Sequence, residues 1–250
     1  MDADDTATTG DSTRSDVAFH FDPVCPFAWM TSKWIRMVAE QRQLRVDWRF
    51  IALRLVNADV DYATHFPAGY EAGHTLGLRL LRVAARVRAD HGNDAVGRLY
   101  AAYGADIFDR YRGRQQEIQA DTAVFVTSVL DQLGLPADLV DALGDTALDP
   151  VVQADTDRAL AATGKDVGTP IIHFDPPDGT AFFGPVISRL PDPDQAVALW
   201  DHITGLARYP GFAELKRSLR EVPQLRAFGM DDGQVGAQRE WNQGRQASAR

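Results

Sequence analysis

The chain has a single cysteine at the junction between a short apolar segment and a helical pattern, and this junction limits the possible folds more than any other feature. Residues 17–21 are almost wholly apolar and predict a buried strand that stops at Asp22. Over 26–41 apolar residues recur at helical spacing, after a proline that suits the first helical turn. Residues 44–53 alternate between apolar and charged residues, as strands do. The expected unit is strand, helix, strand, the start of an α/β sheet, with Cys25 at the mouth of the helix.

A long helical pattern interrupts this sheet before strands return. The helices expected from apolar stripes lie at 76–87, 96–111 and 118–133. Shorter helices are expected to continue to about residue 164. A β-hairpin is expected from the apolar segments 171–174 and 181–183, which flank a turn rich in Pro, Asp and Gly. Short closing helices are expected at 192–204 and 212–219.

Composition excludes several classes of function. The chain of 250 residues is 45% hydrophobic and carries a formal net charge of -9, which disfavours nucleic-acid and anionic membrane surfaces as partners. It has no run of about 18 apolar residues that would span a membrane. One cysteine allows no intramolecular disulfide and no thiolate metal cluster, so no metal is expected. Residues 1–16 lack the parts of a secretory signal, so we expect the reducing cytoplasm, where Cys25 stays a thiol.

Five stretches, in this order, closely resemble the mycothiol-dependent nitroreductase group of the DsbA-like thioredoxin-fold family. They are Phe-Asp-Pro-Val-Cys-Pro (21–26), Trp-Met-Thr-Ser-Lys-Trp-Ile (29–35), Asp-Val-Gly-Thr-Pro-Ile-Ile-His (166–173), Phe-Phe-Gly-Pro-Val (182–186) and Tyr-Pro-Gly-Phe-Ala-Glu-Leu-Lys-Arg (209–217). The resemblance covers roughly residues 16–223. It implies an α/β, thioredoxin-like fold with a large all-helical insertion domain of the DsbA type.

The same resemblance, with the patterns above, predicts how the chain is divided. The expected parts are a disordered N-terminal tail at 1–15, a thioredoxin-like domain at 16–64 and 165–225, a helical insertion domain at 65–164, and a disordered C-terminal tail at 226–250. The two tails are assigned from composition, because they are rich in polar residues. The insertion is expected to form the lid over the site and to set its specificity.

One departure from the family's pattern concerns the chemistry directly. The resembling oxidoreductases carry a second cysteine three residues after the first, and that position is Ala28 here. In the family the first cysteine attacks and the second resolves the mixed disulfide. Cys25 is therefore predicted to act alone, as a nucleophile whose thiolate is favoured by the helix dipole and by unpaired N–H groups. The alternative is that Cys25 is only a small buried apolar residue.

Other residues are assigned to the site by their places around Cys25. The Thr-Pro pair at 169–170 resembles the loop that presents a cis-proline to the cysteine in thioredoxin folds. The residues expected to contact substrate are Asp22, Pro23, Pro26, Phe27, Trp29, Thr169 and Pro170. His20 and His173 are candidates for an acid or base, and for each of them a packed structural histidine is an equal alternative. Trp34 is expected in the core.

Arg79, Arg82 and Arg86 lie on one predicted helical face, with Arg88 nearby. A solvated face is the ordinary interpretation of such a pattern. The alternative is a docking surface for an acidic carrier protein or for an anionic tail of the substrate. The chain has no dinucleotide fingerprint or P-loop, so a reductase would draw its electrons from a thiol.

Three functions follow from a lone thiol in this setting. The first is cis–trans isomerisation of a conjugated small-molecule or carrier-bound substrate, by addition of the Cys25 thiolate, rotation and elimination. The second is a mycothiol-dependent oxidoreductase, nitroreductase or thiol transferase, in which mycothiol or another low-molecular-weight thiol resolves the adduct. The third is a non-catalytic binding module. We favour the first and expect no tightly bound cofactor, while the substrate's identity and a homodimeric state stay open.

Overall fold

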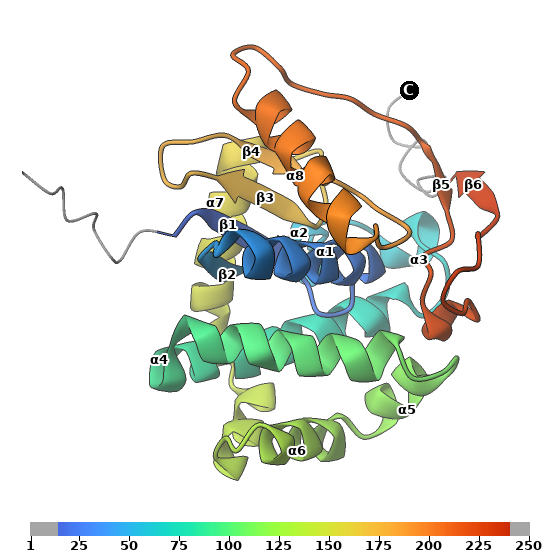
Figure 1. Ribbon diagram of the computed structural model, residues 1–250. Helices are drawn as coiled ribbons and strands as arrows, with labels where there is room; N and C mark the ends of the chain where they lie inside the picture. Colours follow the sequence, from blue (N-terminus) through green and yellow to red (C-terminus); the bar gives the residue numbers. More distant parts are fainter. Residues whose placement is uncertain (1–14, 241–250) are drawn as a thin grey trace, which may run out of the picture.

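The computed structural model describes residues 15–240 and places a four-stranded sheet at the centre of the molecule (Figure 1). The strands are β1 (Val17–Phe21), β2 (Val46–Phe50), β3 (Ile171–Phe174) and β4 (Ala181–Phe183), in the order β2-β1-β3-β4. β1 is parallel to β2 and antiparallel to β3, and β3 is antiparallel to β4. The predicted strand–helix–strand unit and the hairpin are both confirmed. The tail predicted at 1–15 lies outside the described residues, except for residue 15.

Helices cover both faces of this sheet. α1 (Pro26–Arg42) and α8 (Pro193–Ala207) contact each other on one face, and α7 (Asp149–Thr163) lies behind the sheet, where it contacts β1, β2 and β4 (Figure 1). All five residues of β1 are buried, as expected for a strand with helices on both sides. This is the thioredoxin-like arrangement that the sequence predicts. The insertion boundary predicted at 164 comes one helix too late, because α7 packs on the sheet.

The helical insertion is built around one long element. α4 (Tyr70–Phe108) joins the two helices predicted at 76–87 and 96–111, with a kink at Gly92. Gly92 has φ 81° and ψ 178°, a conformation that glycine adopts without a steric penalty. The remaining elements of this region are α2 (Leu53–Val56), α3 (Tyr62–His65), α5 (Arg114–Ala120), α6 (Thr122–Gln132) and the 3₁₀ segments Ala137–Gly144 and Thr146–Leu148.

Two glycines of α4 allow a large aromatic ring of α1 and one of β2 to approach the helix backbone. A Cβ atom on Gly104 would lie in the ring of Trp29, and one on Gly97 would lie 2.6 Å from Nε1 of Trp48. Both rings are buried, at 4% and 6% exposure. The insertion and the thioredoxin-like part therefore share one continuous core.

This packing gives a stability prediction with a matched control. Gly104→Ala should lower the free energy of unfolding by about 1–3 kcal/mol, because the rigid Trp29 ring leaves no room for the added methyl group. Gly205→Ala on α8 has no atom within 4 Å of the new Cβ and should raise it by about 0.5–1 kcal/mol through helix propensity. Urea unfolding of the two variants measures the contrast. If both variants changed the free energy of unfolding equally and in the same direction, the close approach of Trp29 to Gly104 would be contradicted.

The C-terminal segment differs from its prediction. The helix expected at 212–219 does not form; β5 (Leu219–Glu221) instead pairs antiparallel with β6 (Gln238–Glu240), with a 3₁₀ turn (Arg226–Phe228) between them. The disordered tail predicted at 226–250 is thus wrong over 226–240, and 241–250 lie outside the described residues. Leu225 anchors the segment, since it is 1% exposed and belongs to the main core. We call residues 219–240 the C-terminal ribbon; it lies at the end of the molecule near α3 (Figure 1).

Within residues 15–240, none of the helices has both the length and the apolar character needed to cross a bilayer.

Candidate functional site

Cys25 lies where β1, α1 and the segment before β3 meet. It is the N-cap residue of α1, and its Sγ accepts a hydrogen bond from the Ala28 N–H at 3.4 Å. The same Sγ donates to the carbonyl oxygen of Thr169, also at 3.4 Å. The Thr169–Pro170 peptide bond is cis, as the resemblance to thioredoxin folds implied. Thr169 is fixed in turn by its hydroxyl, which donates to the carbonyl of His20 at 3.2 Å.

The expectation of a low pKa for this thiol is wrong for the structure as it stands. Cys25 is only 8% exposed, and this burial raises the pKa of the thiol to about 12. The N–H groups of Ala28 and Phe27 favour the thiolate, as does Arg220, whereas Asp22 disfavours it. The helix N-terminus therefore acts as expected, but desolvation of the thiolate outweighs it. The thiol is therefore protonated at neutral pH. For reaction, a base must take the proton, or the site must open so that solvation of the thiolate lowers the pKa.

The raised pKa gives a prediction for the free protein. The rate of alkylation of Cys25 by iodoacetamide should rise about tenfold for each pH unit up to about pH 10, because only the thiolate reacts. The rate is measured from the intact mass of the protein over time at each pH. Because the chain has one cysteine, the added mass is assigned to Cys25. A plateau that begins near neutral pH would show that the thiol is already ionised there.

Asp22 is buried behind the cysteine loop. It is 0% exposed; Oδ1 accepts from the Val24 N–H at 3.0 Å and Oδ2 from the Leu53 N–H at 2.8 Å. Burial raises the pKa of this carboxyl to about 7, against the effect of the two hydrogen bonds. Gly77 of α4 leaves it room, since a Cβ there would lie within 2.4 Å of Oδ1. In this structure the Asp22 carboxylate holds the backbone at Val24 and Leu53, and the predicted substrate contact stays a prediction.

The aromatic residues after Cys25 have two different roles. Phe27, one of the residues expected to contact substrate, is 4% exposed and lies under the C-terminal ribbon. Trp29 packs under α4 and donates from Nε1 to Asp109 at 3.1 Å, which places its ring in the core. Trp34 is fully buried, as expected, and donates to the carbonyl of Ala196 at 2.9 Å. Around the thiol, Pro23 is buried and Pro26 half-buried.

Neither histidine is hydrogen-bonded to the thiol, whose described partners are Ala28 and Thr169. His20 is 3% exposed, its Nδ1 lies 3.5 Å from the carbonyl oxygen of Phe50, and burial lowers its pKa to about 4. His173 pairs with Ala18 in the sheet register, and its Nε2 lies 2.9 Å from the carbonyl oxygen of Gly179. The structure thus favours the structural alternative for both. Over residues 15–240, no three His, Cys, Asp or Glu side chains are grouped to hold a metal.

Two site residues were missed by the sequence analysis. Arg220 of β5 has its Cζ 5.5 Å from the ring centroid of Phe27 and 5.9 Å from that of Phe183. Tyr70 begins α4, and burial raises the pKa of its hydroxyl; Arg239 acts in the opposite direction and Cys25 adds to the rise. Both residues come from segments far from Cys25 in sequence, and no local pattern marks them. Arg220 follows directly after residues 212–219, which were expected to form a helix.

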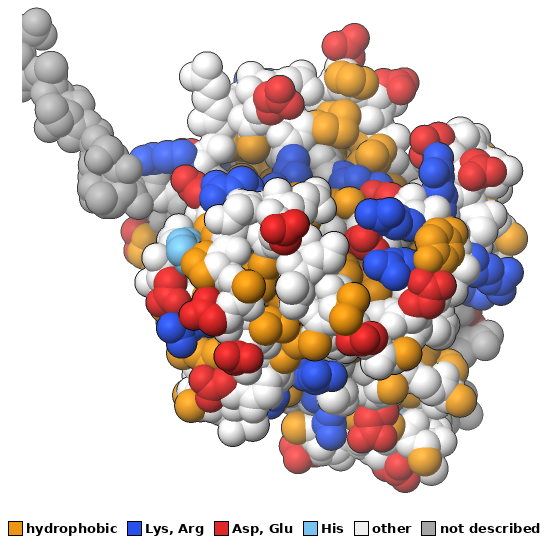
Figure 2. Space-filling model, turned by 90° about the horizontal axis from the view of Figure 1, so that it is seen from below, with side chains coloured by type: hydrophobic (Ala, Val, Ile, Leu, Met, Phe, Trp, Pro, Cys, Tyr) orange, Lys and Arg blue, Asp and Glu red, His pale blue; other side chains and the backbone are white. Residues whose placement is uncertain are grey.

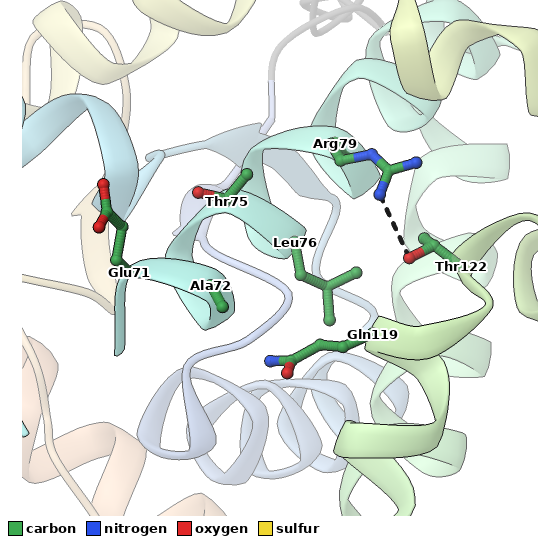
Figure 3. Close-up of a pocket in the computed structure, with 7 residues that line it drawn as sticks. All are labelled: Glu71, Ala72, Thr75, Leu76, Arg79, Gln119 and Thr122. Carbon is green, nitrogen blue, oxygen red and sulfur yellow. Dashed lines mark hydrogen bonds between the residues drawn. The ribbon is translucent and has the colours of Figure 1, made fainter. Parts of the chain in front are cut away.

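The described cavities lie away from the thiol. One of about 390 Å³ is lined by residues of α4 together with Gln119 and Thr122, and Arg79 donates to Thr122 across it at 3.5 Å (Figure 3). Its α4 residues lie on the face turned away from Gly77 and so from Asp22. A second cavity of about 500 Å³ is formed mainly by α6. Cys25 is not among the lining residues of either cavity.

The basic face expected on α4 is largely neutralised by its own ion pairs. Arg82 binds Asp149 at 2.6 Å, and Arg86 binds Asp90 at 2.5 Å. Arg88 binds Asp155, which is buried. Figure 2 shows positive and negative side chains interspersed over the face seen from below, without a broad basic surface. The structure therefore gives no support to docking of an acidic carrier here.

Comparison with known proteins identifies the family. The family model described as "Rv2466c-like: Mycothiol-dependent nitroreductase Rv2466c" matches residues 24–217. A Mycobacterium tuberculosis protein described as "Uncharacterized protein Rv2286c" is 36% identical over 202 residues, which are 80% of this chain and 81% of that protein.

Similar solved structures are more distant. A 2-hydroxychromene-2-carboxylate isomerase is 16% identical with a TM-score of 0.49, over 77% of this chain and 96% of that one. The cytosolic disulfide reductase DsbM from Pseudomonas aeruginosa is 17% identical with a TM-score of 0.47, over 76% and 99%. The family match, which spans the cysteine, the cis-proline loop and the segment up to Arg217, shows that this chain belongs to the Rv2466c-like family of mycothiol-dependent nitroreductases.

Proposed function

We propose that Cys25 acts as a monothiol nucleophile that isomerises a conjugated double bond by reversible addition. The observation that carries this proposal is the residue at the resolving position. Ala28 is fully buried beside the thiol and offers Sγ only its backbone N–H, at 3.4 Å. The chain has no second cysteine. Membership of a family described as mycothiol-dependent nitroreductases supports thiol-dependent enzyme chemistry at Cys25.

The isomerisation needs no oxidant or reductant. Cys25 loses its proton to a base, and the thiolate adds to the electron-poor carbon of the alkene; a C–S bond forms while the π electrons move to the conjugated carbonyl as an enolate. The former double bond is now single and rotates. When the enolate electrons return, the C–S bond breaks, the alkene reforms in the other geometry, and the thiolate recovers its proton. Substrate and product have the same mass.

A second candidate function is favoured by the family match itself. A mycothiol-dependent reductase would pass two electrons to its substrate from the Cys25 thiol and one mycothiol, which become joined as a mixed disulfide; a second mycothiol then attacks this disulfide, frees the Cys25 thiol and leaves as mycothiol disulfide. The low-molecular-weight thiol then replaces the missing cysteine and carries the two electrons. In both functions the partner is a small molecule, in a reducing compartment such as the cytoplasm that keeps Cys25 as a thiol. A non-catalytic module is disfavoured by the family match.

Product geometry separates the two enzymatic functions. Conjugated enones and polyenes of defined geometry are incubated with the protein, with and without mycothiol, and products are analysed by chromatography and mass. Conversion between cis and trans isomers at constant mass without any thiol, and its loss in Cys25→Ala, supports the isomerase. Turnover that requires mycothiol and yields a reduced product would overturn it and establish the reductase.

A further inference from the structure

Cys25 is closed off from solvent in this structure, although its proposed chemistry requires a carbon atom of the substrate to reach Sγ. The residue is 8% exposed, and both described cavities are lined by other residues. Reacting atoms come within about 3–3.5 Å of each other before a bond forms. A segment next to Cys25 must therefore move before a substrate can react.

The C-terminal ribbon packs across the end of α1 at which Cys25 lies (Figure 1). The guanidinium of Arg220 lies over Phe27, in the first turn of α1, with Cζ 5.5 Å from the ring centroid, and over Phe183 of β4 at 5.9 Å. The 3₁₀ turn of the ribbon, residues 226–228, contacts α4 of the insertion. The ribbon therefore joins the thioredoxin-like part to the insertion across the turn whose N-cap residue is Cys25.

Contacts with the segment after β4 hold the ribbon in this place. The Gln224 N–H donates to the carbonyl of Ser188 at 2.8 Å, and the Ser188 hydroxyl donates to the carbonyl of Glu221 at 3.1 Å. Arg189 forms an ion pair with Glu221 at 3.0 Å. Leu225 is 1% exposed and belongs to the main core.

The ribbon is less firmly packed than the other segments around Cys25. Its two strands have three residues each, and all of β6 is exposed. A two-stranded ribbon is at best marginally stable by itself. By contrast, β1, Pro170 and Ile171 are buried. The family match, which includes Cys25 and the cis-proline loop, ends at residue 217, before the ribbon begins. Of the neighbours of Cys25, the ribbon therefore separates from the molecule at the lowest cost in free energy.

We propose that the C-terminal ribbon acts as a lid that covers Cys25 and separates from the first turn of α1 to admit the substrate. This inference rests on the proposed function only in taking Cys25 as the reacting group. Opening uncovers the first turn of α1, so that Sγ and the ring of Phe27, an apolar surface for a conjugated substrate, become accessible together. Closure over the bound substrate then excludes water from the transient enolate.

The test measures how fast iodoacetamide alkylates Cys25 in full-length variants whose ribbon contacts are weakened. Rates are followed by intact mass at one pH. Leu225→Ser should raise the rate about tenfold or more, because a smaller, polar side chain in the core raises the population of the open form. Gln224→Pro removes the N–H that donates to Ser188 and leaves the core unchanged; it should raise the rate about fivefold. This second variant keeps the test decisive if Leu225→Ser does not fold.

Leu139→Ser is the matched control, because Leu139 is a similarly buried leucine that lies in the insertion. It lowers the global stability without touching the ribbon, and its alkylation rate should stay within about twofold of the wild type. Hydrogen exchange, followed by mass spectrometry, gives a second measurement. In the two ribbon variants the amides of residues 219–240 should exchange faster, while those of β1 should not.

Two results would overturn the lid. One is an unchanged alkylation rate in a ribbon variant whose hydrogen exchange shows that the ribbon has opened. The other is an increase in Leu139→Ser as large as that in the ribbon variants. The assay needs only the thiol of Cys25 and no turnover. The lid therefore stands if no isomerisation is found, and the isomerisation stands if the alkylation rates do not change.

Discussion

Cys25→Ala is expected to reduce turnover by about 10³-fold or more, whichever of the two enzymatic functions is correct. Both chemistries form a covalent bond to Sγ, and the chain has no second cysteine to replace it. The measurement is the initial rate of product formation for the wild type and the variant under identical conditions. Full turnover in Cys25→Ala would exclude every covalent mechanism.

The fold should survive this change, which makes the loss of activity informative. Sγ makes two hydrogen bonds, both at the long distance of 3.4 Å, and alanine fits the space of a small buried residue. Ser32→Ala is the matched control, because Ser32 is a fully buried residue of the same helix whose hydroxyl donates to the Trp29 carbonyl. It should keep most of the activity. Circular dichroism and thermal melts of both variants check that the fold is retained.

The difference in free energy of unfolding between Asp22→Asn and the wild type is expected to change by about 4 kcal/mol with pH. This is the equivalent of a carboxyl pKa that burial raises from 3.8 to about 7. A carboxyl whose pKa rises on folding stabilises the fold most when it is protonated. Its contribution is complete below about pH 3.8 and is lost as the pH rises through about 7. The variant cannot ionise, so it should gain stability relative to the wild type over this window.

The measurement is the difference in free energy of unfolding between wild type and variant, from urea titrations at several pH values. The difference is needed because His20 and His74, whose pKa values are lowered to about 4 by burial, act in the opposite direction in the wild type. Both histidines are present in the wild type and in the variant, so their contributions cancel in the difference. Asp94→Asn, which removes a carboxyl group from an exposed site on α4, is the matched control. A difference for Asp22→Asn that is constant from about pH 4 to about pH 9 would contradict the raised pKa.

Much of the fold follows from local patterns. The strand at Val17–Phe21, the helix from Pro26 and the hairpin at 171–183 were predictable because their apolar spacing and their prolines report directly on backbone structure. The thiol at the helix N-terminus follows from the same patterns. The cis bond before Pro170 came from the family resemblance rather than from any local signal.

The properties that were mispredicted depend on contacts between distant segments. The pKa of Cys25 is set by its burial, and one of the residues near it, Arg220, lies almost two hundred positions away in the chain, at the ribbon. Trp29 was expected to contact substrate, and the close approach of Gly104 of α4 to its ring makes it part of the core. Residues 226–240 have the composition of a tail, yet Leu225 and the pairing of β5 with β6 hold the segment in place. Sequence spacing does not carry such information.

The most direct test of the central claim is the mass of the species trapped on Cys25. The wild type is incubated with a conjugated enone in the absence of thiols, and intact mass is measured before and after dilution. The account predicts an adduct on Cys25 equal to the whole mass of the enone, which is released on dilution as a mixture of both isomers. An unmodified Cys25 under these conditions, together with a mycothiol disulfide on Cys25 whenever oxidised mycothiol is supplied, would contradict it.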